Sequence, residues 1–70
     1  MRIRYSRHAL LRMNERGISK NDIEATIASG KKADAPGGAR IAIHQTKFGI
    51  LVVKYRIING LEIKVITTYY

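Results

Sequence analysis

The hydrophobic periodicity of this chain changes once, near Ala39, and this change limits the folds that the chain can adopt. Before Ala39 the apolar residues recur at the spacing of an amphipathic helix, and after it they alternate with polar residues. Alternation is typical of strands that bury one face of a sheet. The sequence therefore predicts helices first and an antiparallel sheet afterwards.

Start and stop signals divide the first part of the chain into two helices. Ser6 is a good N-cap for the first helix, and Gly17 can end it in the left-handed conformation. Ser19 can cap the second helix, with Asp22 placed to complete a weak capping box, and Gly30 ends it. The positions expected to face the core are Ala9, Leu10, Met13, Ile23 and Ile27.

Three alternating segments follow, at residues 39–46, 50–58 and 61–69. Their apolar residues share one face only if both hairpin loops contain an odd number of residues. We therefore expect three-residue loops at 47–49 and 58–60, with Gly60 left-handed in a bulge, and Ile41 and Ile43 facing the core. Residues 2–5 form an extended lead-in that can add an edge strand, and residues 31–38 form a loop.

These elements predict an α+β fold in one domain, residues 1–70. Two N-terminal helices pack on one face of a small antiparallel β-meander of three or four strands. A chain of 70 residues leaves no room for a second core.

Charge is the main feature of the composition. The net charge of +8 favours a polyanion such as RNA, or an acidic protein, as the partner. The absence of cysteine excludes disulfides and thiolate metal sites, and two histidines with five carboxylates make a metal site unlikely, so no cofactor is expected. No apolar run has membrane-spanning length and no signal peptide is recognised, so we expect a cytoplasmic protein without membrane contact.

One face of the first helix combines a titratable side chain with two permanent cations. His8, Arg12 and Arg16 are spaced at i, i+4 and i+8, which spans only about 80° of the helix surface. Arginine binds phosphate bidentately, and an imidazole can move a proton near neutral pH. Both arginines can instead pair with nearby carboxylates, at Glu15, Asp22 or Glu24.

The same stretch carries a resemblance to a known family. The pattern H-A-x-x-R-M-x-x-R-G-I, from His8 to Ile18, resembles the signature of a small bacterial and archaeal domain family of undefined function. The V-I-T-x-Y pattern at residues 65–69 matches the last strand of that family, so the resemblance covers nearly the whole chain. This family is similar to the barnase–EndoU–colicin–RelE superfold of small ribonucleases, many of which are toxins.

The resemblance implies metal-independent cleavage of RNA, in which the 2′-hydroxyl attacks the adjacent phosphate. His8 would then act as acid or base, and Arg12 and Arg16 would hold the phosphate and stabilise its developing charge. Thr67 would donate a hydrogen bond to a phosphate oxygen. These residues would form a cleft between the first helix and the last strand.

The uncovered face of the sheet is a second candidate site. RelE-like toxins use basic sheet residues against RNA, and the corresponding nucleic-acid-binding candidates here are His44, Lys54, Arg56, Lys64 and Tyr70. The sequence leaves open which of the two sites acts on RNA.

Three hypotheses for function follow. The first is a ribonuclease-like toxin domain that cleaves RNA and is neutralised by an acidic, antitoxin-like protein. The second is a nucleic-acid-binding module without catalysis, which uses the same charges. The third is an interaction or dimerisation domain that docks an acidic partner, since the edges of so small a sheet also allow a homodimer.

Overall fold

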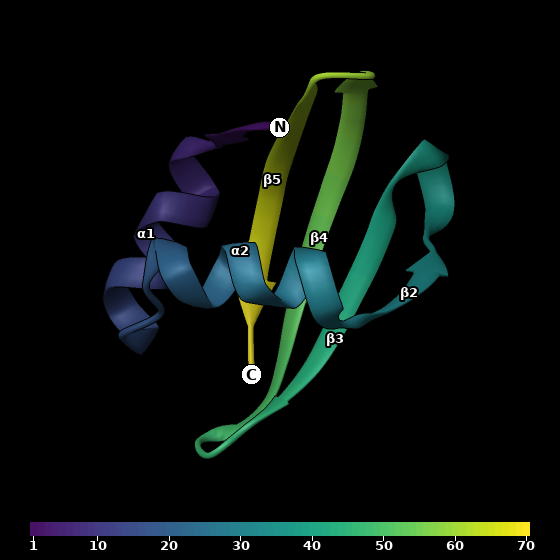
Figure 1. The fold of residues 1–70 in the computed structure, drawn as a ribbon. Coiled ribbons are helices and arrows are strands. Elements are labelled where there is room, and N and C mark those ends of the chain that lie inside the picture. The colour runs from purple at the N-terminus through teal and green to yellow at the C-terminus, as the bar shows by residue number, and fades with distance from the viewer.

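The computed structural model describes residues 1–70 and consists of two layers, a five-stranded sheet and two helices that pack on one of its faces (Figure 1). The elements in chain order are β1 (Arg2–Tyr5), α1 (Arg7–Arg16), α2 (Lys20–Ser29), β2 (Lys31–Asp34), the 3-10 turn η1 (Pro36–Gly38), β3 (Arg40–Thr46), β4 (Gly49–Asn59) and β5 (Glu62–Tyr69). The strand order is β1-β5-β4-β3-β2. The face without helices is called the open face below.

The helix boundaries agree with the local signals in the sequence. The Ser6 hydroxyl caps α1 by accepting a hydrogen bond from the Ala9 amide, and Gly17 ends the helix with φ +67°. Ser19 and Asp22 form a complete capping box at the start of α2. Leu10 is an exception, because it is half exposed rather than buried in the core. Neither helix is long and apolar enough to cross a membrane.

The predicted antiparallel meander of three or four strands is wrong, although the fold remains α+β. The sheet has five strands and is mixed, because β1 runs parallel to β5 with Arg2 opposite Glu62 and Tyr5 opposite Val65. The segment predicted as a loop contains β2, which pairs antiparallel with β3. β1 alternates charged and apolar residues and lies where the sequence allows an edge strand, whereas β2 shows no such alternation. Pairing with the longer strand β3, rather than a local pattern, makes β2 a strand.

Both hairpin loops have two residues, not the predicted three. Thr46 pairs with Gly49, which leaves Lys47 and Phe48 in the first loop. Asn59 pairs with Glu62, and the Asn59 side chain accepts a hydrogen bond from the Leu61 amide at 2.8 Å. In the first hairpin the shorter loop places each side chain of β3 on the face of the sheet opposite to the one predicted. The reason is that a shift of one residue in the pairing register moves every side chain to the other face. Ala42 is consequently buried against Val53, whereas Ile41 and Ile43 lie on the open face.

Two β-bulges adjust the pairing of β4 with β5. One extra residue lies in each strand, Ile58 in β4 and Ile66 in β5. The first bulge accompanies the second hairpin, in which Gly60 is not left-handed as predicted. The second bulge changes which residues of β5 face the helices, because an extra residue reverses the alternation beyond it. Thr68 is therefore buried, and its hydroxyl donates a hydrogen bond to the Val52 carbonyl at 2.8 Å.

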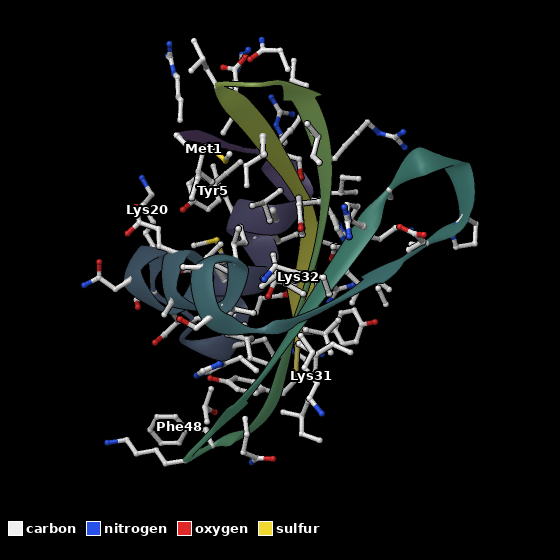
Figure 2. All side chains as sticks on the ribbon, turned by 45° about the vertical axis from the view of Figure 1, so that its right-hand side comes forward. Met1, Tyr5, Lys20, Lys31, Lys32 and Phe48 are labelled. Carbon is white, nitrogen blue, oxygen red and sulfur yellow. The ribbon has the colours of Figure 1, made fainter.

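The core lies between the helices and the sheet. It contains Ala9, Met13, Ile18, Ile23, Ala42, Leu51, Val53, Tyr55, Ile63 and Val65. Tyr5 packs at its margin, with the Lys20 ammonium 5.4 Å from the centre of its ring (Figure 2). Burial, with a contribution from Glu24, raises the pKa of the Tyr5 phenol.

Gly30 lets the end of α2 approach the backbone of β3. A Cβ atom at this position would lie 2.5 Å from the Thr26 carbonyl oxygen and 2.6 Å from the Ile43 carbonyl oxygen. Both are backbone atoms, which cannot move aside as a flexible side chain can. The absence of a side chain at Gly30 therefore sets how α2 joins the sheet.

We expect Gly30→Ala to lower the free energy of unfolding by about 1–3 kcal/mol, because overpacking forces the backbone to shift. The control is Gly60→Ala, since a Cβ there meets no atom within 4 Å and Gly60 has no positive φ. Urea denaturation should show a change of less than about 0.5 kcal/mol for the control. Equal stability of the two variants would contradict the close approach.

Candidate active site

A cleft of about 370 Å³ lies between α1 and the end of β5. The helix contributes His8, Arg12 and Arg16. The end of β5 contributes Thr67, Thr68 and Tyr69, and Tyr70 follows the strand. The structure thus brings together all of the residues predicted for the helix–strand site, including Thr67. Their assembly depends on how α1 is attached to β5.

Ser6 makes that attachment. Its hydroxyl accepts a hydrogen bond from the Ala9 amide at 3.0 Å and donates one to the Ile66 carbonyl at 2.7 Å. Its backbone amide donates to the Val65 carbonyl at 3.0 Å. One residue therefore begins the helix and also joins it to β5 at the bulge.

The cleft lies along the end of β5, where no other strand pairs with the edge that faces α1. β1 pairs only with residues 62–65, and the chain then turns at Ser6 into α1, which packs beside β5 instead. The bulge at Ile66 places Thr67 opposite Lys54 and leaves Thr68 facing the core. Thr67 therefore reaches the cleft from the free edge of the sheet and not from the helix-facing side that the sequence predicts.

The electrostatics of the cleft favour an anion. Arg12 pairs with Glu15 on the same helix, with 3.2 Å between Nη1 and Oε1. His8 and Arg16 form no ion pair, and both are exposed. The helix thus brings two guanidinium groups to the cleft, of which only that of Arg12 is paired with a carboxylate. The Thr67 hydroxyl adds a hydrogen-bonding group from β5. Guanidinium groups are the side chains that suit phosphate best, so the charge of the cleft favours a phosphate among anions.

The open face carries a row of cations. Arg4 lies opposite Lys64, and Lys64 lies opposite Arg56, on three adjacent strands. Like charges directly opposite each other destabilise a sheet, so this row favours contact with an anion. Arg56 also donates a hydrogen bond to the Gly37 carbonyl. Glu62 offsets the row only at one end, where its carboxylate lies 3.9 Å from Arg4.

The structure divides the residues predicted for the open face. Lys54, Arg56 and Lys64 share that face, as expected. His44 does not, because it lies opposite the buried residue Leu51 and lines a separate pocket beside the end of α2. Tyr70 lines the cleft with Thr67. The two-residue hairpin explains the position of His44.

Thr68 is a cleft residue that the sequence does not predict. A regular alternation in the last strand predicts that Thr68 faces away from the helices, and nothing in the sequence indicates a bulge at Ile66. The V-I-T-x-Y pattern was the only local sign that this end of the strand has a role.

Comparison with known proteins adds a family but no activity. The family model described as "Domain of unknown function (DUF4258)" matches residues 5–70. Searches of curated proteins and of solved structures give no match. The matched range includes all of the residues that line the cleft.

Ser6→Ala should lower the free energy of unfolding by about 1 kcal/mol, as loss of an N-cap does, and should also disturb the cleft. Ser19→Ala is the matched control, because it removes the cap of α2 with no bond to β5. Amide chemical shifts should move at residues 66–70 in Ser6→Ala only. Similar shifts there in both variants would show that Ser6 acts merely as a cap.

Proposed function

The chain belongs to the family of the domain of unknown function DUF4258, and we propose that its function is to bind RNA in the α1–β5 cleft and to cleave it without a metal ion. The observation that carries this proposal is the meeting of His8, Arg12, Arg16 and Thr67 in one cleft. Three of these residues come from one helix, and Thr67 comes from a strand more than fifty residues later in the chain.

The residue types suit transfer of a phosphodiester within RNA. In the proposed step the ribose 2′-oxygen forms a bond to phosphorus and loses its proton to the His8 imidazole. The bond from phosphorus to the 5′-oxygen breaks, and that oxygen takes a proton from solvent. The products are a 2′,3′-cyclic phosphate and a free 5′-hydroxyl.

Arg12 and Arg16 would stabilise the negative charge that grows on the non-bridging oxygens during this step. Such charge stabilisation is commonly the largest contribution to catalysis. Thr67 would orient the phosphate through its hydroxyl group. The pair with Glu15 engages one nitrogen of Arg12 and leaves its other donors for the phosphate, whereas Arg16 has no ion pair.

The size of the cleft supports a short segment of RNA as the substrate. About 370 Å³ lies near the lower limit of ordinary ligand pockets. The rest of the RNA would lie outside the cleft, where the net charge of +8 attracts its backbone.

The cation row on the open face supports a second candidate function. Arg4, Lys64 and Arg56 could hold a polyanion without any chemistry at the cleft. In that case RNA binding would weaken steeply with salt and would tolerate the loss of His8. One experiment separates this function from cleavage.

The experiment compares the protein with its His8→Ala and His44→Ala variants on mixed-sequence RNA in EDTA. We expect His8→Ala to lose about 10²- to 10⁴-fold in cleavage rate, which is the usual contribution of a general acid or base. His44→Ala is the matched control, because it removes the only other histidine from a pocket outside the cleft. Analysis of the cleaved ends should identify 2′,3′-cyclic phosphate.

Arg16→Ala provides a second reading of the same proposal. It should reduce cleavage, and Glu15→Gln should not, because Arg16 is proposed to contact the phosphate and Glu15 is not. Intact RNA with all proteins, or equal cleavage by His8→Ala and His44→Ala, would overturn the proposal. A salt-sensitive gel shift without cleavage would support the binding function instead.

A further inference from the structure

The loop between β3 and β4 presents an aromatic ring to solvent. Phe48 is 74% exposed, although it is the only phenylalanine in the chain. The hairpin extends beyond the body of the protein (Figure 1), and the Phe48 ring lies at its tip, toward the side that carries the helices (Figure 2). The ring is not part of the hydrophobic core and does not pack against it.

The tip holds Phe48 in a defined position. The Thr46 hydroxyl donates a hydrogen bond to the Gly49 carbonyl at 2.8 Å and accepts one from the Phe48 amide at 3.1 Å. These bonds close the two-residue loop with a side chain as well as with the backbone. The backbone that carries the ring therefore loses little conformational freedom on binding.

Tyr70 connects this tip to the cleft. It lines the cleft, and its Cδ1 atom lies 3.8 Å from the position that a Cβ atom on Gly49 would occupy. Gly49 is next to Phe48 in the chain. Tyr69, another cleft residue, pairs with Val52, four residues from Phe48, which is roughly 13 Å along an extended strand. The tip of the β3–β4 hairpin therefore lies next to Tyr70, at the rim of the cleft.

We infer that Phe48 stacks on an unpaired base of the RNA whose phosphate occupies the cleft, and so selects single-stranded RNA. This inference rests on the proposed function of the cleft. An aromatic ring offers a face to any base, but only an unpaired base can leave its neighbours to stack on it.

The neighbouring charge supports RNA as the occupant. The Lys47 ammonium lies 5.3 Å from the centre of the Phe48 ring, so a cation accompanies the aromatic surface. A basic residue beside an exposed ring is the combination by which proteins hold single strands, with the cation on the backbone and the ring on the base. An apolar contact with a protein would need neither the cation nor the aromatic character of the side chain.

The test measures binding of a fluorescent 2′-O-methyl RNA oligonucleotide, which lacks the attacking hydroxyl and cannot be cleaved. Phe48→Ala should weaken binding of the single strand by about 5- to 100-fold, as loss of one stacked base does. Phe48→Trp should retain the affinity, and Phe48→Leu should not. Binding of a duplex of the same sequence should be the same for Phe48→Ala and for the unchanged protein.

Leu61→Ala is the matched control. Leu61 is 78% exposed in the loop of the other hairpin, so its loss removes a similar apolar group away from the cleft. It should change the affinity by less than about twofold. Circular dichroism should show that all of the variants are folded, since both residues are exposed.

The inference is overturned if Phe48→Ala binds the single strand as well as Leu61→Ala does. It is also overturned if Phe48→Leu keeps full affinity, which would indicate an apolar contact of the kind made with proteins. If the protein cleaves unmodified RNA but Phe48→Ala does not change binding, the stacking of Phe48 is refuted and the proposed catalysis is not. If Phe48→Ala weakens binding but the protein cleaves no RNA, the proposed catalysis is refuted and the stacking of Phe48 is not.

Discussion

The candidate site depends on the two hydrogen bonds of the Ser6 hydroxyl group. This group satisfies one of the free amides at the start of α1 and at the same time binds the Ile66 carbonyl, at the bulge of β5. The direction of α1 is thereby set relative to the last strand. His8 lies two residues after Ser6, and Arg12 and Arg16 follow on the same face one and two turns later. A small change at Ser6 would therefore be transmitted along the whole cationic face.

The cleft exists because β1 is short. A longer β1 would continue along β5 and cover its free edge with another strand. Instead the chain leaves the sheet at Ser6, and α1 takes the place of the strand beside residues 66–69. The edge of β5 beyond residue 65 is therefore not paired with another strand, and the cleft lies between this edge and α1. The helix side chains that border this space are basic, and their charge favours an anion there.

The positive charges of the protein repel one another, and binding of RNA as proposed would offset this repulsion. Thirteen basic residues and five acidic ones share a domain with a small core. Arg4, Lys64 and Arg56 are placed side by side on adjacent strands, where they repel one another. An RNA backbone would relieve this repulsion at the open face and at the cleft together. The exposed Phe48 is an apolar group near the cleft and would contribute the part of binding that charge does not supply.

The sequence by itself determined the features that depend on a few neighbouring residues. The caps at Ser6 and Ser19, the stop at Gly17 and the common face of His8, Arg12 and Arg16 all follow from interactions within about one or two helical turns. Tertiary structure alone decided the parallel pairing of β1 with β5, the lengths of both hairpin loops and the bulge at Ile66. These features depend on hydrogen bonds and packing between distant segments, which leave little trace in local patterns. For this reason the sequence correctly places Thr67 in the cleft but predicts the wrong face of β5 for its side chain. It also groups His44 with lysines that lie on the opposite face of the sheet.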